Sequence, residues 1–342
     1  MIFFKAEANN KIGRGHFERS IALAKELISA GIESSFIFSD TPQPLIEKIL
    51  EAGFPVHIID INKQLDSSSY LNIIPQNSLI VFDTDDNRFY FGSLIDDLRK
   101  RNIKTACYSI SDLYTISTDI LINPNIVSQI HKYNTESYTR KYLGTQYLIY
   151  RNEFRELAPK FKEYYTPLNL LLIFGNADSN HLTMYFLDVI EKLGNILNKV
   201  NIVAGILNPD LEKIKSKVNE IKNIETELHI NTNKIISIYE ETDVAITAAG
   251  MAMWEMALFN IPQMVIASSR REIEYAKYLS DLNYIYSLGV FSDISSSDEM
   301  AKKIIGILKS ETLKELKSEE FQSIIDPNGI KNIVDVLIGE MD

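Results

Sequence analysis

Short apolar runs alternate with stretches of helical periodicity along almost the whole chain, and this alternation constrains the fold more than any other feature. Strands separated by helices imply right-handed βαβ crossovers and parallel sheets. The pattern occurs in two series. The predicted strands lie near 2–4, 35–38, 56–59, 79–82, 105–108 and 120–122 in the first series, and near 168–174, 200–204, 224–229, 244–247, 262–267 and 285–287 in the second. The sequence therefore predicts an α/β protein with two doubly wound, Rossmann-like domains.

The segment 150–167 separates the two series, because it is rich in charge and tyrosine and contains two prolines. We predict an N-terminal domain over residues 1–155, a second domain over 165–326, and a C-terminal helix over 327–342 that can pack back on the first domain. Ligands of open parallel sheets bind at the carboxyl ends of the strands. Two such sheets that face each other across a cleft would place the site in that cleft.

Composition excludes several classes of protein. The net charge is −11 over 342 residues, which argues against a nucleic-acid partner. The single cysteine, Cys107, excludes a disulfide framework and favours a cytoplasmic protein. The charged residues Lys5 and Glu7 lie within the first apolar run, which argues against the core of a signal peptide. No run approaches the roughly 18 apolar residues that a membrane span needs. Peripheral contact with a membrane and the oligomeric state are left open.

A Gly-x-Gly turn links the first predicted strand to the first predicted helix. Gly13 and Gly15 let the backbone bend tightly and approach a ligand closely. His16 follows directly, and Arg19 comes three residues later. A helix N-terminus offers N–H donors and partial positive charge, which disfavours imidazolium and keeps the imidazole able to accept a proton. His16 is the candidate general base, and the alternative is a histidine that only packs or caps the helix.

Two strand ends of the second series can also contact a ligand. Gly175 and Asn176 follow its first strand, although an ordinary βα turn explains them equally well. In the stretch 247–255 a buried strand passes into a helix through small residues, where a diphosphate can approach backbone N–H groups. The candidate contacts there are Ala249, Gly250, Met251 and Ala252. Glu255, one turn further, can accept both hydroxyls of a ribose or simply complement the helix dipole.

Polar residues end two further strands. Ser269 and Arg270 can bind a phosphate or a carboxylate, or can be a solvated helix start. Asp83 and Asp85 are candidate substrate contacts, and with Asp86 they raise the question of a metal site. No histidine or further carboxylate stands at ligand spacing from them, so we predict neither a metal ion nor any other cofactor.

Four stretches together resemble a known family. Residues 12–19 match I-G-x-G-H-x-x-R, and residues 142–154, 174–183 and 248–262 resemble further motifs. The chain resembles the UDP-sugar hydrolases of pseudaminic acid biosynthesis and their spore-coat polysaccharide relatives, which are similar to the GlcNAc transferase of lipid II synthesis. The resemblance implies a GT-B fold and a nucleotide-sugar substrate. It also implies that His16 activates a water which releases UDP from a UDP-linked amino or deoxy sugar in nonulosonic acid or surface-polysaccharide biosynthesis. The diphosphate would lie near 250–252 and the ribose on Glu255.

The chain departs from the family pattern where the sugar and the diphosphate would lie. Asp85 stands in place of a tyrosine, Ser269-Arg270 replaces Asn-Gln, and Met251 and Ala252 replace hydroxyl residues. The leading Arg-x-Asp becomes Lys5-Ala6-Glu7. Two alternatives therefore accompany the hydrolase. One is a glycosyltransferase of the same fold that uses a UDP- or CMP-sugar donor, and the other is an inactive relative that binds a nucleotide sugar.

Overall fold

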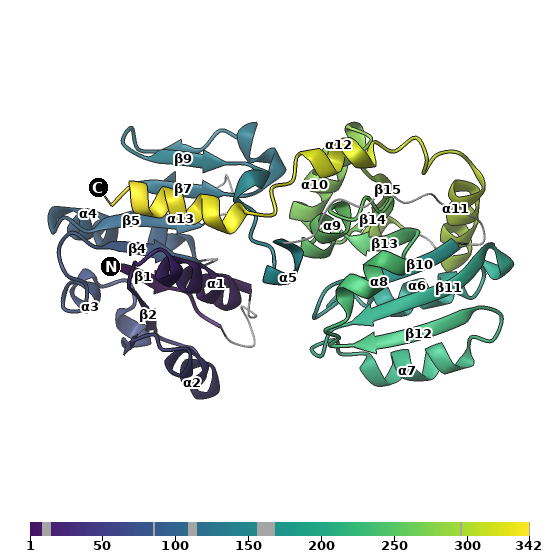
Figure 1. Ribbon diagram of the computed structural model, residues 1–342, viewed down its shortest axis with the longest axis horizontal. Helices are drawn as coiled ribbons and strands as arrows, with labels where there is room; N and C mark the ends of the chain where they lie inside the picture. The colour runs from purple at the N-terminus through teal and green to yellow at the C-terminus, as the bar shows by residue number, and fades with distance from the viewer. Residues whose placement is uncertain (9–14, 85, 109–114, 156–167, 295, 342) are drawn as a thin grey trace. The chain divides into compact units, whose positions relative to one another are not determined.

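The computed structural model describes residues 1–8, 15–84, 86–108, 115–155, 168–294 and 296–341. The chain divides into two compact units, one formed by Met1–Tyr150 with Asp326–Asp342 and the other by Arg151–Ile325 (Figure 1). Each unit contains one large parallel sheet with helices packed against it. The predicted α/β class with two doubly wound sheets is confirmed.

The sheet of the first unit has the strand order β3-β2-β1-β4-β5-β7-β9, and every neighbouring pair is parallel. Its strands are β1 (Ile2–Lys5), β2 (Ser34–Phe38), β3 (Val56–Ile58), β4 (Leu79–Phe82), β5 (Lys104–Tyr108), β7 (Ile120–Asn123) and β9 (Arg140–Leu143). The short strands β6 (Thr115–Ile116) and β8 (Asn134–Thr135) pair separately. The chain order reverses between β1 and β4, and ligands of doubly wound sheets bind at this reversal.

Helices cover both faces of this sheet, so strands such as β1, β2, β4 and β7 are buried on both sides, whereas the edge strands β3 and β9 are not. The helices are α1 (Gly15–Ser29), α2 (Gln43–Glu51), α3 (Ser67–Leu71), α4 (Ser93–Lys100) and α13 (Gly329–Gly339). Alternation along β1 places Phe4 in the core under α1 and α13, and Phe3 in the core under α3 and α4. A strand buried on both faces reads as a continuous apolar run, which explains why β1 is recognisable in the sequence.

The C-terminal helix α13 lies beside α1 and completes the core of the first unit (Figure 1). Ile333 and Leu337 are fully buried there. A Cβ atom at Gly329 would overlap the backbone carbonyl of Leu148, so only glycine fits where the helix begins. At the other end, Glu340 accepts hydrogen bonds from Tyr142 and Arg140.

The second unit repeats the architecture with the strand order β12-β11-β10-β13-β14-β15. Its strands are β10 (Leu168–Ile173), β11 (Leu197–Ala204), β12 (Glu225–Ile230), β13 (Val244–Ala248), β14 (Gln263–Ala267) and β15 (Tyr286–Val290). Its helices are α5 (Asn152–Arg155), α6 (Leu182–Ile190), α7 (Leu211–Glu220), α8 (Ile235–Glu241), α9 (Met251–Ala257), α10 (Arg270–Asp281), α11 (Ser297–Lys309) and α12 (Ser318–Ser323). No helix in the described ranges is long and apolar enough to cross a bilayer.

Candidate functional site

The strongest polar cluster of the first unit joins α1 to the end of β4. His16 is the second residue of α1, and Asp83 directly follows β4. The Nδ1 atom of His16 lies 2.6 Å from Oδ1 of Asp83. Asp83 is 1% exposed, and the side chain of His16 is 13% exposed. The two residues therefore meet at the reversal of the strand order, where the doubly wound topology predicts a ligand.

Arg19 engages the same carboxylate from one turn along α1. Its Nε donates to Oδ2 of Asp83 over 2.7 Å, and its Nη2 donates to Oδ1. The guanidinium also stacks on the ring of Tyr108, with Cζ 4.1 Å from the ring centroid. Burial alone would raise the pKa of Asp83, but the charge of Arg19 and the hydrogen bonds from both residues hold that pKa below its usual range. Asp83 is therefore a carboxylate at neutral pH.

The contacts of His16 with Asp83 and Arg19 suit a general base. The contact of 2.6 Å to a carboxylate is shorter than the 3.0 Å that separates Nδ1 of His16 from Nη2 of Arg19, so Nδ1 is best assigned as the protonated nitrogen. That tautomer places the lone pair on Nε2, where a proton can be accepted. The Asp83 carboxylate would then stabilise the imidazolium that forms.

The other residues predicted for this region are placed less directly. Gly15 begins α1, and a Cβ atom there would meet nothing within 4 Å, so no steric reason requires glycine at this position. Gly13 and Asp85 lie outside the described residues. Asp86 pairs with the guanidinium of Arg88 over 2.6 Å.

The second unit has a cavity of about 320 Å³ at the carboxyl ends of its central strands. Four residues predicted from the sequence line it: Gly175, Asn176, Ala252 and Glu255. Ala249, Gly250, Met251, Ser269 and Arg270 do not line it. Sequence reasoning missed the other lining residues, which include Arg151, Gly205, Asn231, Thr232 and Ile235.

Two glycines shape this cavity for different reasons. Gly175 has φ +85°, a left-handed conformation that side chains disfavour. A Cβ atom at Gly205 would overlap the backbone of Asn176, so the loops after β10 and β11 can approach closely only with glycine there. Asn231, at the end of β12, is also left-handed, with φ +47°. The sequence signal for Gly205 was a lone glycine after an apolar run, which is too common to single out.

Glu255 is the centre of the polar cluster in this cavity. Nε of Arg151 lies 3.1 Å from Oε1 of Glu255, and Nη2 lies 3.0 Å from Oε2. The hydroxyl of Tyr239 donates to Oε2 over 3.1 Å. Burial raises the pKa of Glu255, and Arg151 opposes part of that shift. A carboxylate has about four lone-pair sites, and Arg151 and Tyr239 occupy three of them, so Glu255 keeps about one site for a hydroxyl donor of a ligand.

Helix capping accounts for two other polar turns. Asp178 accepts hydrogen bonds from the backbone N–H groups of Leu182 and Thr183, over 2.9 and 2.8 Å, at the start of α6. Ser269 accepts from the N–H of Glu272 over 3.3 Å at the start of α10. Hydroxyl and carboxylate side chains at these positions satisfy donors that a helix leaves unpaired. Ser269 and Arg270 are both exposed.

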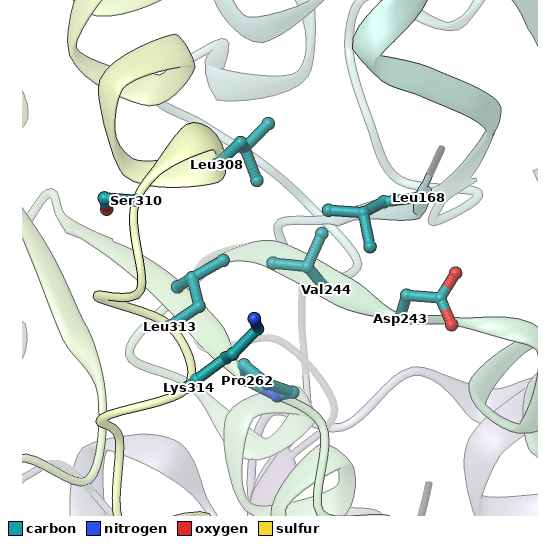
Figure 2. Close-up of a pocket in the computed structure, with 8 residues that line it drawn as sticks. All are labelled: Leu168, Asp243, Val244, Pro262, Leu308, Ser310, Leu313 and Lys314. Carbon is teal, nitrogen blue, oxygen red and sulfur yellow. The ribbon is translucent and has the colours of Figure 1, made fainter. Parts of the chain in front are cut away.

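A further cavity of the second unit lies at the amino ends of the strands, opposite the cavity of about 320 Å³ (Figure 2). Leu168 begins β10, Val244 begins β13 and Pro262 precedes β14, so these residues mark the amino ends of the strands. The cavity measures about 70 Å³, and leucine, valine and proline side chains point into it. The carboxylate of Asp243 accepts from the backbone N–H of Asn169 over 2.8 Å. The position and size of this cavity do not suit a nucleotide.

The described residues contain no group of three histidine, cysteine or acidic side chains placed to hold a metal ion. Two of the three acids that raised this question already pair with cations, since Asp83 binds Arg19 and Asp86 binds Arg88.

Sequence comparison finds a family profile that matches the second unit and distant relatives that match most or part of the chain. Residues 160–326 match the profile of the family described as lipid-A-disaccharide synthetase. An uncharacterized protein of Methanocaldococcus jannaschii is 27% identical over 316 residues, which are 84% of this chain and 61% of that protein. The spore coat polysaccharide biosynthesis protein SpsG of Bacillus subtilis is 22% identical over 200 residues, 58% of each chain. The chain thus spans about three fifths of the length of these two relatives.

A third relative is matched over nearly its whole length. It is the UDP-2,4-diacetamido-2,4,6-trideoxy-beta-L-altropyranose hydrolase of Campylobacter jejuni, which is 22% identical over 293 residues, or 83% of this chain and 97% of that enzyme.

Solved structures show the fold. MurG of Acinetobacter baumannii superposes with a TM-score of 0.69 at 14% identity and covers 99% of each chain. UGT2 of Phytolacca americana, complexed with UDP-2fluoro-glucose and pterostilbene, has a TM-score of 0.61 at 12% identity, with 99% of this chain and 98% of that chain covered. The chain therefore has the GT-B type of α/β fold, with two Rossmann-like units.

Proposed function

We propose that this chain releases UDP from a UDP-linked amino or deoxy sugar, with His16 as the general base and water as the nucleophile. The observation that carries the proposal is the contact of 2.6 Å between Nδ1 of His16 and the buried carboxylate of Asp83. A histidine oriented in this way, at the point where the strand order of the sheet reverses, can accept a proton from a bound water.

The proposed step balances without an added reagent. The water oxygen forms a bond to the anomeric carbon, and its proton passes to Nε2 of His16. The bond between the anomeric carbon and the diphosphate oxygen breaks, and UDP leaves with the electron pair. Asp83 stabilises the imidazolium, and Arg19 keeps Asp83 ionised.

The nucleotide would occupy the cavity of about 320 Å³ in the second unit. Glu255 is proposed to accept from one ribose hydroxyl, while Arg151 holds its carboxylate in place through two hydrogen bonds. We propose that the diphosphate lies near residues 250–252. Support comes from the position of this cavity at the carboxyl ends of the strands, where α/β sheets bind ligands.

The nucleophile distinguishes two candidate reactions. Similarity to a UDP-sugar hydrolase over 97% of that enzyme supports water. A second candidate is transfer of the sugar to an acceptor hydroxyl, with His16 removing the acceptor proton, and the resemblance of the fold to solved glycosyltransferases favours it. The name of SpsG supports a role in polysaccharide biosynthesis for either reaction.

The decisive experiment uses the purified full-length chain in water enriched in ¹⁸O, with a panel of UDP- and CMP-sugars, with and without acceptor sugars. Hydrolysis is expected to release UDP without an acceptor and to place one ¹⁸O atom on the freed sugar. Release that requires an acceptor would replace the hydrolase by the transferase. Binding of a nucleotide sugar with no turnover under either condition would overturn both.

A further inference from the structure

Two loops of the second unit line the proposed nucleotide cavity, and side chains that the proposed reaction does not use link them to each other. The first loop, residues 174–181, joins β10 to α6, and the second, residues 205–210, joins β11 to α7. Gly175, Asn176 and Gly205 of these loops line the cavity. The contact between His181 and Asp210, the last residues of the two loops, is termed the loop clasp.

The loop clasp is a hydrogen bond between Nδ1 of His181 and Oδ2 of Asp210, which are 29 residues apart in sequence. The side chain of Asp210 is 5% exposed, whereas that of His181 is 59% exposed. Hydrogen bonds from Lys213 and His181 hold the pKa of Asp210 below its usual range, so Asp210 is a carboxylate at neutral pH. The clasp is therefore a charge-assisted hydrogen bond between the two loops.

Both residues of the clasp stand at helix starts, yet they contact each other. His181 is at the N-cap position of α6, and Asp210 is at the N-cap position of α7. An aspartate at this position usually accepts from a backbone N–H of its own helix, which stabilises the helix. Within the described residues, neither side chain caps its helix. The Asp210 carboxylate therefore contacts the other loop in place of its own helix.

The first loop has a backbone conformation that its side chains disfavour. Asp178 has φ +41° and His181 has φ +57°, both in the left-handed region. Every other non-glycine residue in that region of the described chain is an asparagine, which tolerates it better. Such strain persists only where surrounding contacts hold it, and it is concentrated at ligand sites. The clasp is one of the contacts that hold this loop.

Further contacts join the loops close to the cavity. Nδ2 of Asn208 lies 3.4 Å from Oδ2 of Asp178, and the backbone N–H of Asn208 donates to the carbonyl of Gly205 over 3.1 Å. A Cβ atom at Gly205 would overlap the backbone of Asn176, so the two loops touch where they line the cavity. Movement of either loop would therefore displace a wall of the cavity.

The helices that follow the loops are anchored without the clasp. Phe186 and Ile190 of α6 and Ile214 of α7 are buried in the same hydrophobic core. Ion pairs with an exposed member contribute little to the stability of a fold. What the clasp adds is a fixed position for the residues that precede each helix, and these residues form the cavity.

We propose that His181 and Asp210 are positioning residues, which hold the loops 174–181 and 205–210 in the conformation that binds the nucleotide. The inference rests on the proposed function, which places the nucleotide in this cavity. The described residues that line the cavity include neither His181 nor Asp210, so the pair acts through Asn176 and Gly205. A cavity with walls fixed before binding loses less conformational entropy when the ligand binds, and it therefore binds more tightly.

A double-mutant cycle on the full-length chain tests the proposal, with UDP affinity measured by titration calorimetry. His181→Gly removes the imidazole and accepts the left-handed backbone, and Asp210→Ala removes the acceptor from the other loop. Each change is expected to weaken UDP binding about tenfold, the effect of losing one charge-assisted hydrogen bond. The double variant should bind UDP about as well as either single variant, because both changes remove the same contact.

Two further variants separate the clasp from a general effect on stability. His181→Asn should restore UDP affinity, because Nδ2 of asparagine can take the place of Nδ1 and asparagine tolerates the left-handed backbone. Lys213→Met is the matched control. Lys213 donates to the other oxygen of Asp210 over 2.9 Å, but it lies one turn along α7, so its loss leaves the two loops joined. UDP affinity should not change in this variant.

Unchanged UDP affinity in both single variants would overturn the proposal, as would losses that add in the double variant. Failure of the proposed function has a different signature, which hydrogen exchange of the free chain reveals. The N–H groups of Leu182 and Thr183, which are bound to Asp178, should exchange faster in both single variants. If only the proposed function fails, wild type will not bind UDP while this exchange still responds. Exchange at the wild-type rate in both variants would overturn the clasp itself.

Discussion

Arg151 and Glu255 form a two-bond ion pair across 104 residues of sequence, with Nε and Nη2 of the arginine 3.1 and 3.0 Å from the two carboxylate oxygens. Glu255 is 7% exposed, and burial raises its pKa. The arginine thus offsets the cost of a buried carboxylate in the cavity proposed to bind the nucleotide.

Removal of the Glu255 carboxylate should weaken UDP binding. Glu255→Ala is expected to cost about 1–3 kcal/mol of binding free energy, because a charge-assisted hydrogen bond to the ribose is lost. Titration calorimetry with UDP measures this, and Glu225→Ala, at an exposed position on β12 of the same unit, is the control. Unchanged affinity would mean that Glu255 does not contact the nucleotide and only stabilises the second unit. Binding of CMP without UDP would support the nucleotide cavity and reject the substrate class.

His16→Asn should lower turnover by roughly 10²–10⁴-fold, the usual contribution of a general base, and should leave UDP affinity nearly unchanged. Asparagine cannot take up a proton at neutral pH but preserves a polar group of similar reach. Single-turnover rates with a UDP-sugar, measured beside UDP affinity, separate the two effects. Turnover at the wild-type rate would remove His16 from the mechanism.

Asp83 should make stability depend on pH in a definite direction. Its pKa in the folded chain lies below the unfolded value of about 3.9, so its contribution is present above that value and is lost as pH falls through the folded pKa. The difference in unfolding free energy between wild type and Asp83→Asn should be largest near pH 7 and should shrink toward pH 3. Urea unfolding at several pH values measures the difference, and a constant difference would contradict the assignment.

Activity should survive EDTA. Two carboxylates that follow β4 are bound by arginines, Asp83 by Arg19 and Asp86 by Arg88, so they make poor ligands for a divalent ion. UDP release before and after chelation is the measurement. Activity that disappears with EDTA and returns with Mg²⁺ or Mn²⁺ would show that these acids bind metal.

Two glycines of α13 offer a matched pair of stability tests. Gly329→Ala should destabilise the chain by about 1–3 kcal/mol, because its Cβ would overlap the carbonyl of Leu148. Gly339→Ala meets nothing within 4 Å, and alanine favours helix by up to about 1 kcal/mol, so this change should be neutral or stabilising. Thermal unfolding of both variants decides, and equal effects would contradict the packing of α13.

The parts of the fold that sequence could predict are those in which burial enforces a pattern. Strands such as β1 and β4 are buried on both faces and read as continuous apolar runs. The edge strand β9 (Arg140–Leu143) went unpredicted, because its first two residues are exposed, its last two are only partly buried, and it carries no such run. The Gly-x-Gly turn before a helix indicated His16, and the end of a strand indicated Asp83, but only the folded arrangement of α1 beside β4 brings them together. Arg151 could not be predicted, since its partner is distant in sequence and a lone arginine has no periodicity.

The course of α13 has a consequence for biosynthesis. The first unit needs Ile333 and Leu337 for its core, so it remains incomplete until α13 has left the ribosome, after the whole of the second unit. The second unit is one continuous segment, Arg151–Ile325, and every residue of it is available earlier. Domains generally fold as units during synthesis. The half of the chain that is synthesised first therefore finishes folding last, and during that interval the surface that α13 later covers is exposed to chaperones and proteases.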